Sequence, residues 1–229
     1  MTKLTSLPQA APHSATELVF DTIYEAVVRL KLPPGTRVSE AKVAEQLGVS
    51  RQPVRDAFFR LANRGFLLIR PQRATLVTRI SEAKVCRAAF IRIALETACI
   101  KAVIERVTEA QLSELHALLR AQGDVVARED REAFHLLDEA FHERLCDIAG
   151  QSKVWYLIRE QKGHMDRARF LSLSFNQSSA HAEHAQILTA IKARDLISAS
   201  ERLEAHLTKI RSHLAQIRLA HSAYFEEER

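Results

Sequence analysis

The chain has 229 residues, of which 33 are Lys or Arg and 28 are Asp or Glu, so its formal net charge is +5. A chain of this length can bury the core of one large domain or of two modest ones. Residues 1–80 carry 12 basic and 6 acidic side chains, a net charge of +6, whereas the remainder carries 21 and 22. The basic excess lies wholly in the N-terminal part, which indicates either a polyanionic partner for that part or a solvated basic surface.

The cysteines and the hydropathy of the chain indicate the cellular compartment in which we expect the protein. The three cysteines, Cys86, Cys99 and Cys146, are widely spaced and form no C-x-x-C pair, which argues against a disulfide framework and favours a reducing cytoplasm. No apolar run approaches the roughly 20 residues that span a bilayer. The N-terminus also lacks the apolar stretch of a secretory signal. We therefore expect a cytoplasmic protein without a membrane partner, and a loose N-terminal arm over residues 1–13.

The first expected helix follows this arm. Ser14 and Glu17 have the spacing of a capping box. Apolar residues then recur at roughly helical spacing, namely Leu18, Ile23, Val27 and Leu30. The helix should end near Lys31, because Pro33-Pro34-Gly35 cannot continue it.

Two short helices and a tight turn are expected next. Ser39 can cap a second helix, which Gly48 ends in the manner of a left-handed turn residue. Ser50 then opens a third helix, with Pro53 in its first turn, where a missing N–H has no cost. Gly65 closes that helix. This order of elements predicts a helix-turn-helix whose second helix enters the major groove of DNA.

A hairpin and a helical region complete the expected fold. Two short β-prone runs, at 66–69 and 75–78, predict a hairpin or wing, so that residues 14–80 form a winged helix-turn-helix. Beyond this the chain has no Pro and almost no Gly. Helices are expected near 82–106, 109–127, 130–149, 152–173, 178–193 and 195–222. Thr108 with Gln111 and Asp195 mark helix starts. The protein is thus mainly α, and residues 81–225 form an all-α bundle of about six helices.

The candidate DNA contacts lie at the start of the third helix and near the wing. Those on the helix are Ser50, Arg51, Gln52 and Arg55. Arg can bond guanine in bidentate fashion and Gln can pair with adenine, while Ser and the helix amides can bind phosphate. Arg37 and Arg73 are placed for contact with the DNA backbone or minor groove. A single Arg is more often a solvated surface charge, but the turn, cap, spacing and wing together favour DNA.

These residues resemble the winged helix-turn-helix of GntR-type transcriptional regulators. The matching residues are Leu32-Pro33-Pro34-Gly35, Val38, Glu40, Val43-Ala44, Leu47-Gly48-Val49-Ser50-Arg51, Pro53-Val54-Arg55, Ala57-Phe58, Leu61 and Gly65. The family usually has Gly at the wing tip, where this chain has Ala74. If that position requires a positive φ, Ala costs on the order of 1 kcal/mol and weakens the grip of the wing on DNA.

Four side chains of the helical region form a candidate metal site. Asp138 and His142 are four residues apart, which places them on one helix face about 6 Å from each other. His184 and His206 lie at nearly equal distances from the turn between the last two helices, so an antiparallel hairpin brings them level. One carboxylate and three imidazoles around an open position suit Zn, Ni or another borderline divalent ion. The alternative is that these are ordinary surface or polar-core histidines, and His135 or His181 could compete.

The helical region is similar to the effector-binding domain of the FadR-like (FCD) branch of the same family. The resemblance implies that Asp138, His142, His184 and His206 hold a divalent metal. It also matches Arg92 to an arginine that often faces the effector pocket, where a guanidinium would favour a carboxylate. The alternative for Arg92 is an ion pair with Glu96, four residues later.

The combined prediction is a bacterial transcriptional repressor. It would act as a homodimer on a palindromic operator in double-stranded DNA, and a small carboxylate effector would modulate its affinity. Two alternatives remain. One is a metalloenzyme with a three-His, one-carboxylate centre and an accessory basic domain, and the other is an architectural DNA-binding protein with a structural metal. No H-E-x-x-H or G-x-S-x-G element is visible, so we predict no enzymatic activity.

Overall fold

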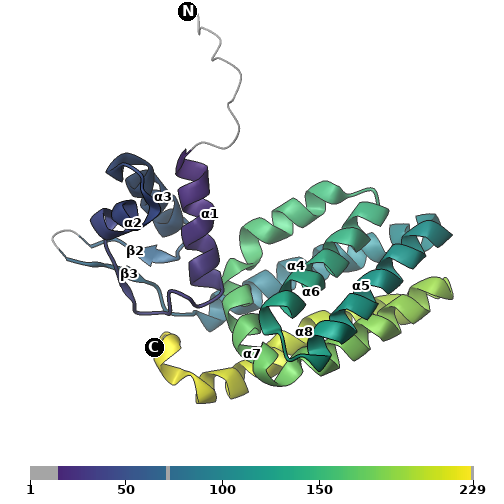
Figure 1. Ribbon diagram of the computed structural model, residues 1–229. Coiled ribbons are helices and arrows are strands. Elements are labelled where there is room, and N and C mark those ends of the chain that lie inside the picture. Colours follow the sequence, from purple (N-terminus) through teal and green to yellow (C-terminus); the bar gives the residue numbers. More distant parts are fainter. Residues whose placement is uncertain (1–14, 71–72, 228–229) are drawn as a thin grey trace, which may run out of the picture. The chain divides into compact units, whose positions relative to one another are not determined.

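A computed structural model describes residues 15–70 and 73–227 of the chain (Figure 1). The described residues fall into two compact units, which are divided between Arg79 and Ile80. The expected N-terminal arm and the Ser14 cap lie outside the described residues. No helix in the described ranges is both long and apolar enough to cross a membrane.

The described part of the first unit contains three helices around one apolar core. The helices are α1 (Ala15–Val28), α2 (Glu40–Leu47) and α3 (Arg51–Asn63). Each helix buries its apolar stripe, and the fully buried side chains include Val27, Val54, Ala57, Phe58 and Leu61. Helix α3 therefore turns its apolar face to the core and its polar face to solvent.

The turn between α2 and α3 confirms the sequence prediction. Gly48 ends α2 with φ 64° and ψ 32°, a left-handed conformation that glycine adopts without a steric penalty. The N–H of Val49 then donates to the carbonyl of Ala44 at 3.0 Å. Ser39 and Ser50 do occupy the N-cap positions of α2 and α3, but neither side chain makes a capping hydrogen bond.

A small antiparallel sheet completes this unit. Its strands are β1 (Arg37–Val38), β2 (Leu67–Leu68) and β3 (Thr75–Val77), in the spatial order β1-β3-β2. The β2–β3 hairpin is the predicted wing, with Leu67 opposite Val77. Strand β1 was not predicted, because two residues are too short to show an alternating pattern.

The structure does not show the backbone strain that was expected at Ala74 if this position required a positive φ. Among the described residues, the non-glycine positions with positive φ are Leu30, Glu129 and Arg194. Ala74 is described and is not one of them, so its side chain meets no left-handed penalty. The absence of Gly at this position therefore does not strain the wing.

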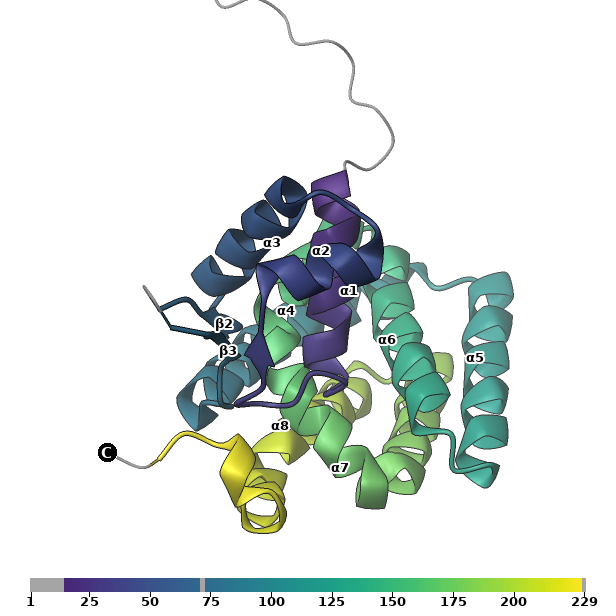
Figure 2. The ribbon, with the colours of Figure 1, turned by 60° about the vertical axis from the view of Figure 1, so that its left-hand side comes forward.

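The second unit is a helical bundle, as expected (Figure 2). Its elements are α4 (Glu82–Arg106), α5 (Glu109–Ala127), α6 (Arg131–Ile148), α7 (Ser152–Lys192), α8 (Leu196–Ala220) and the 3-10 helix η1 (Ser222–Tyr224). The predicted capping box is present, since the N–H of Gln111 donates to Thr108 Oγ1 and Gln111 Oε1 accepts from the N–H of Thr108. Asp195 caps α8 by accepting from the N–H of Ser198 at 3.0 Å.

One predicted boundary is wrong. The helices expected at 152–173 and 178–193 are a single helix, α7, of 41 residues. The expected gap at 174–177 contains neither Gly nor Pro, and Ser, Asn and Gln cost only tenths of a kcal/mol in a helix. The described part of the bundle therefore has five α-helices and η1 rather than about six helices.

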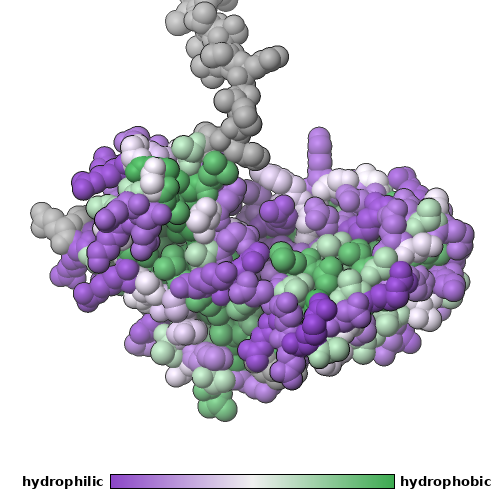
Figure 3. Space-filling view, viewed as in Figure 1, coloured by the Kyte–Doolittle hydropathy of each residue, from purple (hydrophilic) through white to green (hydrophobic). Residues whose placement is uncertain are grey.

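The core of the bundle surrounds the candidate site. Helices α4, α7 and α8 contact one another, and α5 packs with α6. Fully buried apolar side chains line the interior, including Ile100, Leu115, Phe141, Ile187 and Ile191. On the face seen in Figure 3, hydrophilic side chains of this unit are interspersed with smaller hydrophobic areas. The most exposed large apolar side chains here are Phe90, Ile197 and Leu219. All three cysteines are free thiols.

Candidate metal centre and nucleic-acid interface

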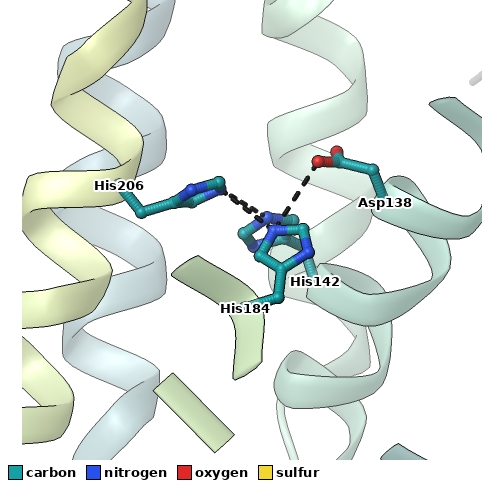
Figure 4. Close-up of side chains that lie close together, drawn as sticks. All are labelled: Asp138, His142, His184 and His206. Carbon is teal, nitrogen blue, oxygen red and sulfur yellow. Dashed lines mark hydrogen bonds and ion pairs between the residues drawn. The ribbon is translucent and has the colours of Figure 1, made fainter. Parts of the chain in front are cut away.

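Four buried side chains converge inside the helical bundle (Figure 4). Asp138 and His142 come from α6, His184 from α7 and His206 from α8. One ligand atom from each residue lies within 4.8 Å of all the others. His206 Nε2 is 3.1 Å from His184 Nε2 and 3.3 Å from His142 Nε2. Asp138 Oδ1 lies 3.6 Å from His184 Nε2. The structure thus brings together all four residues of the candidate site.

The spacing of these nitrogens fits a metal ion. Two nitrogens bound to tetrahedral zinc at about 2.0–2.1 Å are separated by about 3.3 Å. The observed separations of 3.1 Å and 3.3 Å match that value. The donor set of imidazoles and one carboxylate also suits zinc or nickel.

Hydrogen bonds at the far side of each ring fix its orientation. Each Nδ1 lies within hydrogen-bond distance of an oxygen acceptor from another helix. The pairs are His142 with Glu96 at 2.6 Å, His184 with Gln122 at 2.9 Å and His206 with Glu183 at 2.8 Å. We infer that each Nδ1 carries the proton, so each Nε2 presents a lone pair to the centre. Three converging lone pairs repel one another unless a cation lies between them.

These acceptors were not identified from the sequence as part of the site. Glu96 was considered only as an ion-pair partner of Arg92, and Glu183 adjoins His184 but serves His206 instead. Gln122 is fully buried, and its amide also donates to the carbonyl of Leu137 at 3.0 Å. The only available signal was a polar residue on the apolar face of an amphipathic helix.

Burial and neighbouring charges set the protonation states of the ligands. Burial disfavours the charged form of Asp138, but Arg169 and the nearby histidines outweigh it and hold the pKa of this carboxyl well below its usual range. Burial also lowers the pKa of His184 strongly and that of His206, and neighbouring imidazoles add to both shifts. A charged carboxylate and neutral imidazoles are the forms that bind metal.

Arg92 forms the ion pair that was the alternative considered from the sequence, and it also lines a cavity. Its Nε donates to Glu96, which is the alternative ion pair. Its Nη2 is buried and has no hydrogen-bond partner among the described residues. Together with Asp138, Arg169 and His206, Arg92 lines a cavity of about 40 Å³. That volume suits a metal ion with one or a few waters, and it is well below the roughly 300 Å³ of pockets for drug-sized ligands.

The two competing histidines lie outside the cluster. His135 is buried and packs edge-on against Phe170. The Nε2 of His181 is 3.1 Å from the carbonyl of Leu119. Both therefore have the ordinary structural surroundings of histidines in a helical bundle.

In the first unit, the candidate DNA-reading residues line one face of α3. Ser50, Arg51, Gln52 and Arg55 are all exposed at its N-terminal end. Gln52 Nε2 donates to Asp56 Oδ1 at 2.9 Å, and Arg55 Nε donates to Glu40 Oε2 at 3.3 Å. The sequence did not predict that acidic residues hold these two side chains.

Arginines also line a groove beside the sheet of the first unit. The groove has a volume of about 750 Å³, and its basic lining residues are Arg37, Arg70, Arg73 and Arg79. Arg37 and Arg73 were predicted from the sequence, and Arg70 and Arg79 were not. A concave surface with this charge suits a polyanion.

Comparisons with known proteins agree with both parts of this description. The profile of the bacterial regulatory proteins of the gntR family matches residues 15–77, and the FCD domain profile matches residues 88–209. The HTH-type transcriptional repressor RspR of Escherichia coli strain K12 is 34% identical over 230 residues, which is 100% of each chain. A probable D-xylose utilization operon transcriptional repressor of Paenarthrobacter nicotinovorans is 28% identical, covering 82% of this chain and 84% of its own length.

A solved structure has the same fold. Escherichia coli McbR/YncC superposes with a TM-score of 0.76 at 23% identity, over 90% of this chain and 99% of that one. At this identity the similarity shows the fold alone. The named relatives are regulators, so the metalloenzyme alternative is not favoured. The chain belongs to the GntR family of bacterial regulatory proteins, carries an FCD domain, and is a DNA-binding transcriptional regulator.

Proposed function

We propose that this regulator is a repressor whose operator affinity is set by a small organic acid bound beside a divalent metal ion. The observation that carries the proposal is the meeting of three imidazole Nε2 atoms and one carboxylate inside the bundle, beside a cavity that Asp138 and His206 line. Relatives named as repressors support the direction of the effect.

The recognition helix supports operator binding by a homodimer. Arg51, Gln52 and Arg55 are exposed on one face of α3 and present the donors that read base edges. The Ser50 hydroxyl makes no capping bond, so it and the first amides of α3 are placed to bind a phosphate. Two such helices in a twofold dimer would read half-sites about one helical turn apart.

The helical unit supports recognition of an acid. Asp138, His142, His184 and His206 would hold the ion, and zinc or nickel would supply a Lewis-acidic open position for an oxygen ligand. The free Nη2 of Arg92 would then bind the same carboxylate. Because the cavity is small, a ligand larger than a few atoms requires the surrounding helices to move. Such movement is the means by which binding would bias the DNA-reading units.

The test is operator binding with and without metal. An operator would first be selected from random double-stranded DNA, and small organic acids that raise the melting temperature of the zinc-loaded protein would be identified by thermal shift. We expect at least one such acid to change operator affinity in the zinc-loaded wild type and not in H184A/H206A. The matched control is H135A, which removes a buried histidine outside the cluster and should retain the response. An equal response in wild type and H184A/H206A would contradict the proposal.

A further inference from the structure

The carboxylate of Glu96 is divided between two buried donors. Its Oε1 accepts from Nε of Arg92, and its Oε2 accepts from Nδ1 of His142 at 2.6 Å. The three residues are 3%, 3% and 0% exposed, so water does not compete for these hydrogen bonds. One buried negative charge is therefore shared by an arginine and by a candidate metal ligand.

Glu96 forms a buried ion pair with Arg92 in this position. A single carboxylate with two donors distributes its electron density between them, so weakening one hydrogen bond strengthens the other. A stronger bond to Nδ1 of His142 makes its Nε2 a better metal ligand.

The far end of Arg92 reaches the cavity. Its Nη2 is buried and finds no hydrogen-bond partner in the part of the chain that the structure describes, and the residue lines the same cavity as Asp138 and His206. A small anion in that cavity would take the unsatisfied donor and part of the positive charge of Arg92. The pull of Arg92 on Glu96 would then decrease, and the hydrogen bond that His142 donates to Glu96 would strengthen.

We propose that Glu96 is a positioning residue that links anion binding at Arg92 to metal binding at His142, so that a small carboxylate and the metal bind cooperatively. This inference rests on the proposed metal centre. By linkage, the bound anion raises the affinity of the protein for the metal by the same factor by which the bound metal raises its affinity for the anion.

The test measures the dissociation constant of zinc with and without acetate. Zinc affinity would be determined by competition with a chelator at constant ionic strength, with acetamide as the neutral isostere of acetate. In the wild type we expect acetate to lower the dissociation constant of zinc by about 5-fold or more, which is within the range typical of coupled sites. Acetamide should leave this constant unchanged. A wild type that does not bind zinc refutes the metal centre itself, which separates that failure from failure of the coupling.

Three variants isolate Glu96. In E96Q we expect zinc to bind about 10–100-fold more weakly, as when other residues that hydrogen-bond a metal ligand are replaced. The change that acetate causes in the zinc dissociation constant should fall to the part that comes from direct contact between acetate and zinc. E96Q leaves the Arg92 guanidinium without its carboxylate partner, so R92Q is tested as the second variant. R92Q should lose the same part of the change that acetate causes in the zinc dissociation constant. The double variant R92Q/E96Q should lose no more, since both residues act in one chain of contacts.

The matched control is Q122A. Gln122 holds His184 as Glu96 holds His142 but, within the described part of the chain, makes no hydrogen bond with Arg92. Q122A should weaken zinc binding, but the ratio of the zinc dissociation constants without and with acetate should stay as in the wild type. If E96Q weakens zinc binding but keeps the wild-type ratio of zinc dissociation constants without and with acetate, Glu96 is merely structural and the proposal is overturned. Additive losses in R92Q/E96Q would overturn it as well.

Discussion

In the DNA-reading unit, the side chains expected to act lie within the first turns of α3 and face solvent. In the helical unit, the candidate ligands come from α6, α7 and α8 and are buried, and their supporting acceptors come partly from α4 and α5. The first site is a local surface whose parts can be exchanged without disturbing the core. The second is part of the core, so its chemistry and the stability of the fold are coupled.

The largest contrast is expected from two phenylalanines. Phe141 is fully buried and stacks on His184 with ring centroids 4.5 Å apart. F141A should lower the free energy of unfolding by about 3–5 kcal/mol, because it removes a large core side chain, and should also loosen the metal centre. The control is F59A, since Phe59 is 62% exposed on α3, and it should change stability by no more than about 0.5 kcal/mol. Equal losses, measured by urea unfolding, would contradict the distinction between the two regions.

The recognition helix should show the opposite behaviour. R55A removes an exposed side chain and should cost about 1–3 kcal/mol of specific binding per half-site, while the free energy of unfolding stays within about 0.5 kcal/mol of wild type. Fluorescence anisotropy with the selected operator and a scrambled duplex measures the loss of specificity. Full sequence-specific binding by R55A would refute the assignment of this helix as the reader.

Acid should destabilise the metal-free helical unit through its histidines. His184 and His206 have pKa values lowered in the folded state from the usual 6.5, chiefly by burial. Above that pH neither state binds these protons, so the effect is absent. As the pH falls below 6.5, the unfolded chain binds protons that the folded chain resists, and stability decreases by up to about 1.4 kcal/mol per group and pH unit. Urea unfolding of metal-free protein from pH 7.5 to 5.5 measures this slope, and H184N should reduce it. An unchanged stability across this range would contradict the burial of neutral imidazoles.

The smallest effect is expected at the wing. Because Ala74 does not have a positive φ, A74G gains no relief of strain and adds freedom to the unfolded chain. It should therefore lower the free energy of unfolding by about 0.4–1 kcal/mol. A stabilised A74G, detected as a higher urea midpoint, would mean that the position requires the left-handed region after all.

Local signals in the sequence were sufficient for most of the fold. Gly48 as a left-handed turn residue and the Thr108 capping box are contained within a few consecutive residues, and the structure bears out both. The continuity of α7 was missed because polar residues weaken a helical pattern without ending the helix. Strand β1 depends on pairing with β3, a contact between residues about 40 positions apart that no local pattern encodes.

The candidate site divides in the same way. The four possible ligands could be proposed from spacing and family resemblance, and the structure places them together. The acceptors Glu96 and Gln122 lie on helices that carry none of the four ligands, so only three-dimensional packing brings them to the imidazoles. The two surroundings of Arg92, an ion pair at Nε and a cavity beside the residue, likewise depend on three-dimensional packing.

The most direct test of the buried centre is the metal content of the purified protein. Wild type and H184A/H206A would be saturated with zinc, freed of loosely bound ions by gel filtration and measured by elemental analysis. We predict about one zinc per chain in the wild type and none in the double variant, with H135A retaining the wild-type content. Stoichiometric zinc in H184A/H206A, or none in the wild type, would contradict a metal centre formed by these residues.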